Sequence, residues 1–110
     1  MAELESLQVN DDRTGQNAIS ALKAEFIPQS KVKVSLELYE GNDRPNVAFL
    51  LSDSKGTLLA RSYIISCIEQ QMDFTLHIRQ PGWESPLVLV CETFFEENQP
   101  IDKKEVVIHT

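Results

Sequence analysis

Between residues 31 and 39, apolar and polar side chains alternate strictly along the chain. The apolar side chains stand at every second position, as Val32, Val34, Leu36 and Leu38. Side chains two residues apart lie on one face of a strand, whereas the apolar stripe of a helix returns every three or four residues. The segment therefore predicts a β-strand with one buried face and one face in water.

Comparable patterns recur between short turn signals. Further segments with strand character cover residues 4–9, 47–51, 57–65, 72–79, 87–95 and 106–108. The polar loop Asp53–Gly56 predicts a hairpin that pairs residues 47–51 with residues 57–65. Residues 87–95 are apolar at nearly every position, which favours a central strand covered on both faces or placed at a subunit contact. We expect a polar link over Glu96–Asp102 before the last strand.

Residues 18–27 fit two different elements. The spacing of Ile19, Leu22 and Phe26 is that of a helix. The positions of Ile19, Ala21 and Ile27 also suit a strand. Pro28 ends the element in either case, because proline disfavours the helical conformation of the preceding residue. We expect a strand, since an isolated helix of about ten residues is marginally stable without a groove to lie in.

Eight short strands without an intervening helix predict an all-β fold made of two packed antiparallel sheets. We expect an immunoglobulin-like or fibronectin-III-like β-sandwich, with residues 1–110 forming a single domain. The antibody pattern itself is missing, because Cys67 and Cys91 lie too close in sequence to bridge its sheets and Trp83 lies in a turn. The expected core residues are Val32, Val34, Leu36, Leu38, Val47, Phe49, Leu51, Phe74, Leu76, Ile78, Leu87, Leu89 and Cys91.

The composition is that of a compact protein and limits the classes of molecule that it can bind. The chain has 110 residues, of which 42% are hydrophobic and 25% charged, and its net charge is -7. A protein binds nucleic acid by replacing its counterions with Lys and Arg side chains, so a net negative charge makes nucleic acid an unfavourable partner. An anionic membrane surface is unfavourable for the same reason. No apolar run approaches the roughly 20 residues that span a bilayer, and the first residues lack the blocks of a signal peptide. We expect a cytoplasmic protein that binds neither nucleic acid nor a membrane.

The sequence offers few groups for catalysis. It carries no nucleophile elbow, no phosphate-binding glycine loop and no zinc-protease motif. Cys67 and His77 are the only candidates for a nucleophile and a base, and a buried thiol and a surface histidine are the commoner roles of such residues. In a reducing compartment Cys67 and Cys91 should stay thiols. We expect a protein that is not an enzyme and that needs no cofactor, with calcium as the alternative.

Acidic residues concentrate at one end of the expected sandwich. If consecutive strands alternate in direction, the loops at this end hold Asp11, Asp12, Asp43, Glu69, Glu96, Glu97 and Asp102, and the other end holds Asp53 and Glu84. Calcium requires carboxylates of this kind, and C2-type sandwiches supply them from loops. The alternative function is therefore a calcium- or small-ligand-binding C2-like domain with Asp11, Asp12, Asp43 and Asp102 as ligands. Acidic loops that only aid solubility are the competing explanation.

Trp83 is the only tryptophan and lies in a turn between two prolines. Aromatic rings on loops dominate many binding sites, which makes Trp83 a candidate interaction residue. The alternative is that the ring folds back over the end of the sandwich and shields core residues, because a large ring exposed without a partner is unfavourable.

Several apolar residues fall on faces that the alternation assigns to water. They are Tyr39, Leu50, Leu59, Tyr63, Ile65, Val88, Val90, Phe94 and Val107. Some would line the inner surface through a bulge or a register change, and others would form an exposed patch that buries against a second copy or another protein. Val88, Val90 and Phe94 are the expected members of that patch. The leading hypothesis is a non-enzymatic, cytoplasmic β-sandwich that acts through protein contacts, as a small adaptor or an accessory subunit, and that binds a protein partner or itself as a homodimer.

Overall fold

The described residues form seven β-strands and no helix. A computed structural model describes residues 19–39, 45–67, 69–96 and 100–110. The strands are β1 (Ile19–Ile27), β2 (Lys31–Leu38), β3 (Asn46–Ser52), β4 (Leu58–Ile64), β5 (Gln71–His77), β6 (Leu87–Phe94) and β7 (Pro100–Ile108). The all-β prediction is confirmed, and β1 is a strand rather than a helix. The strand expected at residues 4–9 lies outside the described residues.

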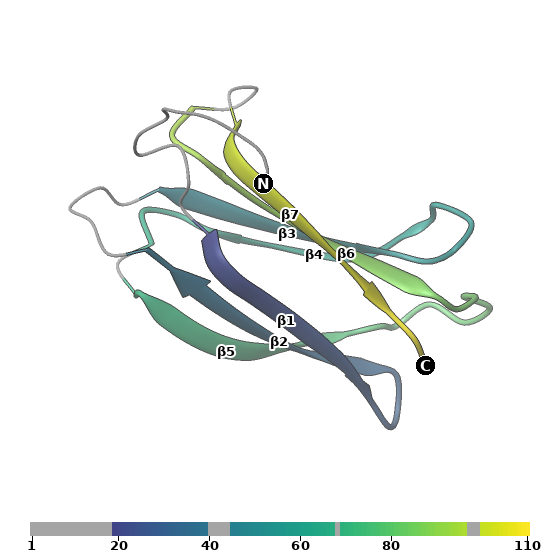
Figure 1. Ribbon diagram of the computed structural model, residues 1–110. Coiled ribbons are helices and arrows are strands. Elements are labelled where there is room, and N and C mark those ends of the chain that lie inside the picture. Colours follow the sequence, from purple (N-terminus) through teal and green to yellow (C-terminus); the bar gives the residue numbers. More distant parts are fainter. Residues whose placement is uncertain (1–18, 40–44, 68, 97–99) are drawn as a thin grey trace, which may run out of the picture.

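The described strands form two antiparallel sheets that pack face to face (Figure 1). One sheet has the order β1-β2-β5, and the other has the order β4-β3-β6-β7. The predicted hairpin is confirmed, because β3 pairs with β4, and β6 is a central strand between β3 and β7. A constant immunoglobulin domain has its fourth strand in the sheet of its first strand. In this protein β4 belongs to the other sheet, which makes that sheet four strands wide.

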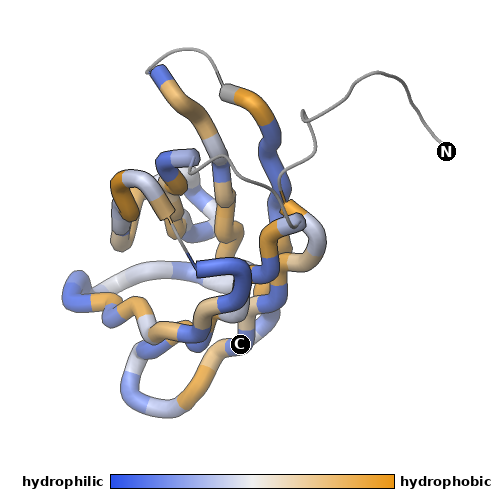
Figure 2. Tube along the Cα trace, turned by 90° about the vertical axis from the view of Figure 1, so that its left-hand side faces the viewer, coloured by the Kyte–Doolittle hydropathy of each residue, from blue (hydrophilic) through white to orange (hydrophobic). Residues whose placement is uncertain are grey.

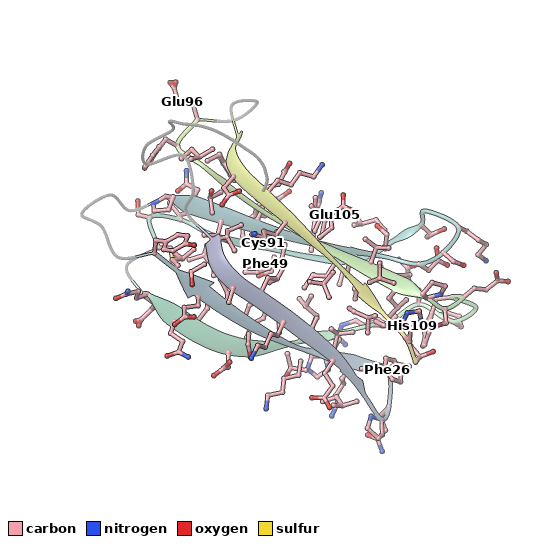
Figure 3. All side chains as sticks on the ribbon, in the orientation of Figure 1. Phe26, Phe49, Cys91, Glu96, Glu105 and His109 are labelled. Atoms are coloured by element: carbon pink, nitrogen blue, oxygen red, sulfur yellow. The ribbon has the colours of Figure 1, made fainter. Side chains whose placement is uncertain are left out.

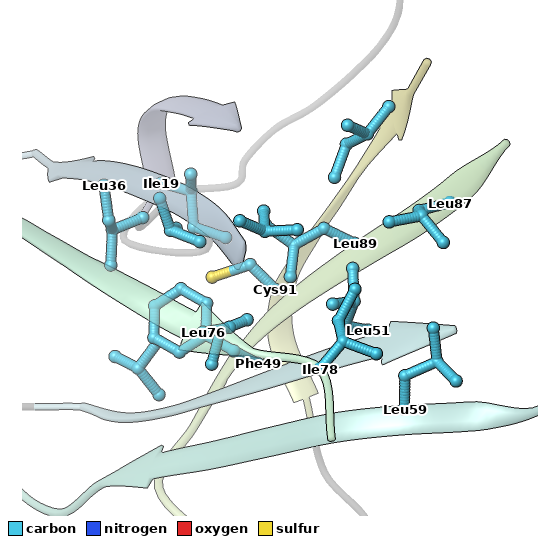
Figure 4. Close-up of a cluster of buried hydrophobic side chains, with 14 of the residues drawn as sticks. Ile19, Leu36, Phe49, Leu51, Leu59, Leu76, Ile78, Leu87, Leu89 and Cys91 are labelled. Atoms are coloured by element: carbon cyan, nitrogen blue, oxygen red, sulfur yellow. The ribbon is translucent and has the colours of Figure 1, made fainter. Parts of the chain in front are cut away.

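The core fills the space between the two sheets. Alternate residues of β2 and β6 point into it, as the period of two requires. Figure 2 shows hydrophobic and hydrophilic residues following one another along the chain. Every predicted core residue is buried except Phe74, which is half-buried. The ring of Phe74 meets that of Phe49 edge-on, with centroids 4.7 Å apart. Figure 4 shows Phe49, Leu89 and Cys91 among the buried side chains of this cluster.

The last strand begins earlier than the sequence predicts. We expected a polar link over Glu96–Asp102, but β7 starts at Pro100 and includes Asp102. Proline is tolerated as the first residue of an edge strand, where its missing N–H leaves little of the ladder unpaired. Asp102 accepts a hydrogen bond from the backbone N–H of Ile19 in β1, so a polar residue is satisfied within the strand. The prediction was wrong here because that partner is distant in sequence.

Asp53 and Glu84 lie at the same end of the sandwich, as predicted, and a hydrogen bond joins them. Asp53 is buried, and its Oδ1 accepts hydrogen bonds from the backbone N–H groups of Lys55 and Thr57, both at 3.0 Å. Its Oδ2 accepts one from the N–H of Glu84 at 3.2 Å, which ties the β3–β4 loop to the β5–β6 loop. Gly56 completes the turn with a φ of +85°, a conformation that other residues rarely adopt.

Candidate interaction surface

The outer face of the four-stranded sheet consists of rows of side chains that the strand register places side by side. The central row, taken from β4 across to β7, holds Arg61, Leu50, Val90 and Glu105. The sequence neighbours of Leu50 and Val90 are buried between the sheets, so these two side chains point away from the core. Figure 3 shows Phe49 and Cys91 between the sheets and Glu105 on the outer side.

Two further rows flank the central row. One holds Tyr63, Ala48, Glu92 and Lys103, and the other holds Leu58, Ser52, Val88 and Val107. The exposed fraction of the side chain is 55% for Tyr63, 55% for Val107 and 41% for Leu58. Apolar groups therefore extend over this face from β4 to β7, with charged groups among them.

The three residues predicted as an interaction patch lie together on this face. Val88, Val90 and Phe94 are on the outer side of β6 and are half-buried. The face also gathers Leu50, Tyr63 and Val107 from the apolar residues that the alternation assigned to water. Leu59 from the same set is buried instead, because the pairing of β3 with β4 shifts its register beside it. A register change of the kind expected from the sequence is thus present at this position.

The outer face of the three-stranded sheet has the opposite character. Its rows hold Ala21, Glu37 and Gln71; Lys23, Ser35 and Asp73; Glu25, Lys33 and Thr75; and Ile27, Lys31 and His77. All but Ala21 and Ile27 are polar or charged, and the hydroxyl of Ser35 donates a hydrogen bond to Asp73. A polar outer face is what an antiparallel sheet with one side in water normally shows. Only the four-stranded sheet departs from this pattern.

Trp83 lies in the β5–β6 loop at the end of the sandwich. Its side chain is half-buried and packs against the core cluster. The ring meets that of Phe26 in β1, with centroids 5.5 Å apart and an angle of 56° between the ring planes. The ring therefore covers the end of the core, as the second interpretation of the sequence has it.

Most of the predicted calcium ligands lie outside the described residues. Asp11, Asp12 and Asp43 fall there, and the fourth, Asp102, lies on β7. Oδ2 of Asp102 accepts a hydrogen bond from the N–H of Ile19 at 3.0 Å, and Oδ1 accepts one from the N–H of Lys103 at 2.8 Å. Within the described ranges, no group of three His, Cys, Asp or Glu residues is placed to hold a metal ion. The calcium site stays a prediction.

The two candidate catalytic groups are not brought together. Cys67 precedes β5, and His77 is the last residue of that strand. The thiol of Cys67 donates a hydrogen bond to the carbonyl oxygen of Glu69 at 3.4 Å. Both cysteines are buried free thiols. Burial, with the negative charges of Asp102 and Glu92 nearby, raises the pKa of Cys91 to about 12, so this thiol stays protonated at neutral pH.

Arg61 and Glu105 are the residues of the central row that the sequence analysis did not single out. Arg61 lies between half-buried Ala60 and Ser62, and Glu105 lies between exposed Lys104 and half-buried Val106, so neither residue stands out in its own strand. Their alignment depends on the pairing of four strands, of which β3 and β6 are distant in sequence. The local pattern of polar and apolar residues does not predict that pairing.

Comparisons with known proteins leave the chain without a family assignment. No protein-family model matches it, and no curated protein matches it. A search of the described residues for a helix long and apolar enough to cross a membrane found none.

Proposed function

We propose that this protein is a non-enzymatic interaction module that binds another protein chain through the outer face of the β4-β3-β6-β7 sheet. The contrast between the two outer faces carries the proposal. Apolar side chains predominate on the two inner strands of one face, beside Ser52 and Glu92, whereas polar and charged side chains predominate on the other. Burial of apolar surface gains about 25 cal/mol per Å², and contiguous apolar patches on a surface mark sites of contact.

The arrangement of the face suits an interface. Leu50 and Val90 lie at its centre, and Arg61 and Glu105 lie on the edge strands at either side. Protein interfaces commonly have an apolar centre, from which charged residues are depleted, and a polar rim. The strands between the two edges also give a rigid, preorganised surface, which lowers the entropy lost on binding.

A cytoplasmic, non-catalytic role belongs to the same proposal. Two buried free cysteines suit a reducing compartment. Cys67 and His77 lie before and at the end of β5, a strand of 7 residues that spans about 20 Å. That separation is too large for a nucleophile and its base, which act within hydrogen-bonding distance.

Photo-crosslinking from two matched positions tests the proposal. In one variant of the full chain, photoreactive benzoylphenylalanine replaces Val107 on the outer face of the four-stranded sheet; in the other it replaces Thr75 on the outer face of the three-stranded sheet. Both native side chains are exposed and lie on strands. Illumination of the producing cells should give a protein adduct from position 107 and none from position 75.

The position dependence of the adduct decides the result. An adduct from position 107 alone, to a second copy or to a different protein, agrees with the proposal. Equal adduct yields from the two positions would contradict it, as would products from position 107 that contain only one chain.

A further inference from the structure

The central row of the four-stranded sheet carries opposite charges at its two ends. Arg61 lies on β4 and Glu105 lies on β7, and both side chains are exposed. Three strand spacings separate them, a distance of about 14 Å. Leu50 and Val90 lie between them. Two side chains so far apart do not form an ion pair within one chain, so their charges are available to a molecule that covers the face.

A second copy can cover this face with aligned strands in two symmetric orientations. When the two-fold axis runs parallel to the strands, the strand order of one copy is reversed over the other. β4 then lies over β7 of the second copy, and β3 lies over its β6. In the other orientation, the axis runs across the strands, in the plane between the facing four-stranded sheets of the two copies. Each strand then lies over the same strand of the second copy.

The charges of the central row distinguish the two orientations. With the axis parallel to the strands, Arg61 faces Glu105 of the second copy, and the same contact occurs a second time by symmetry. With an axis that runs across the strands along this row, Arg61 faces Arg61 and Glu105 faces Glu105. Charges of like sign across an interface oppose association, whereas complementary charges favour it and fix its geometry.

We propose that a second copy of this chain occupies the face, with the two-fold axis parallel to the strands. The inference rests on the proposed function, because it requires this face to be a binding surface. In this orientation Leu50 faces Val90 of the second copy, and Leu58 faces its Val107. In the remaining row Tyr63 faces Lys103 of the second copy, where an ammonium group and an aromatic ring attract each other.

Reversal of the charge pair tests the inference. Arg61→Glu places two carboxylates opposite each other at each end of the dimer, and Glu105→Arg places two guanidinium groups there. The double variant R61E/E105R restores opposite charges in reversed order. Light scattering after size-exclusion chromatography, over a range of concentrations of the full chain, gives the dimer dissociation constant of each variant.

We expect the wild type and the double variant to have the mass of two copies. Each single variant should dimerise roughly tenfold more weakly or worse. Lys33→Glu, an exposed charge reversal on the other sheet, serves as the matched control and should leave dimerisation unchanged. Circular dichroism and a thermal melt verify that each variant is folded. We expect this result, because positions 61 and 105 are exposed.

The outcomes separate this inference from the function on which it rests. A wild type with the mass of one copy at every concentration overturns the second copy as occupant; an adduct from position 107 to a different protein would then leave the proposed function standing. A dimer that neither single variant weakens, or that the double variant does not restore, overturns the proposed orientation. Absence of any adduct from position 107 overturns the proposed function itself.

Discussion

The carboxylate of Asp102 accepts a hydrogen bond at 3.0 Å from the backbone N–H of Ile19, a residue 83 positions earlier in the chain. The bond joins β7, an edge strand of the four-stranded sheet, to the start of β1 in the other sheet. These two strands lie close together at one side of the sandwich (Figure 1). Asp102 thus links the two sheets at an edge where no ladder between the described strands does so.

Replacement of Asp102 should destabilise the fold. Asp102→Ala leaves the N–H of Ile19 without its part-buried acceptor, and a hydrogen bond to a charged group contributes about 1.5 to 3 kcal/mol; the bond to the N–H of Lys103 is exposed, so water can replace it. We expect the free energy of unfolding, measured by urea denaturation, to fall by about 1 to 3 kcal/mol. Glu25→Ala, which removes an exposed carboxylate on β1, is the control. An equal loss in the two variants would refute the role assigned to Asp102.

Thr93 lies opposite Asp102 in the register of β6 and β7 and is fully buried. Its Oγ1 has no hydrogen-bond partner in the part of the chain that the structure describes. An unpaired buried hydroxyl costs about 1 to 3 kcal/mol, and valine has nearly the same shape without it. We expect Thr93→Val to raise the free energy of unfolding by about 1 kcal/mol. Thr93→Ser, which keeps the hydroxyl and loses the methyl group, should lower it; a valine variant less stable than the wild type would contradict this account.

Leu36 and Leu89 lie on opposite walls of the core and are almost completely buried. Either residue truncated to alanine should lower the free energy of unfolding by about 2 to 5 kcal/mol, because the lost side chain leaves a cavity that the packed sheets fill only partly. Lys33→Ala, at an exposed position between two buried residues of β2, should change it by less than about 0.5 kcal/mol. Chemical denaturation of the three variants measures the difference. Similar values for the buried and the exposed positions would be inconsistent with this core.

The buried carboxyl of Asp53 predicts a specific acid sensitivity. Burial alone would raise its pKa, but the backbone N–H groups of Thr57, Glu84 and Lys55 together hold it below the ordinary value of 3.8. The unfolded chain therefore binds a proton more readily at this group than the folded chain does. The contribution of Asp53 to stability is present above the unfolded-state pKa and is lost as the pH falls through the lower, folded-state value.

Calorimetry across the acid range checks this sign. The melting temperature of the wild type should decrease as the pH falls below about 4. In Asp53→Asn, which does not titrate, the melting temperature should be lower at neutral pH and should depend less on pH over the same range. Parallel profiles for the two proteins would show that Asp53 does not contribute to the acid sensitivity.

The strands could be predicted because their signal is local. In β2, burial follows the polar and apolar alternation residue by residue, so the sequence alone identifies both the strand and its buried face. The assignment of residues 19–27 to a strand also followed from local reasoning, since a short isolated helix has little stability. Local periodicity and chain length were sufficient for the fold class.

The features that could not be predicted depend on how the strands pair with one another. Leu59 faces the core because the register shifts at its own hairpin, and β7 begins at Pro100 although the segment before Lys103 is polar. The alignment of Arg61 with Glu105 likewise requires three strand pairings: β4 with β3, β3 with β6, and β6 with β7. Alternation identifies an outward position but does not say which residue of a neighbouring strand lies beside it.

Solvent access at the methyl groups of Val107 and Thr75 tests the central claim most directly. Both side chains point outward from their sheets, and Val107 is 55% exposed in a single chain. A soluble nitroxide added to the isotope-labelled protein enhances the relaxation of methyl groups that face solvent. If a second copy covers the four-stranded sheet, the methyl groups of Val107 should relax much more slowly than that of Thr75. Equal enhancement at the two positions would show that both outer faces are open to water and would contradict the account.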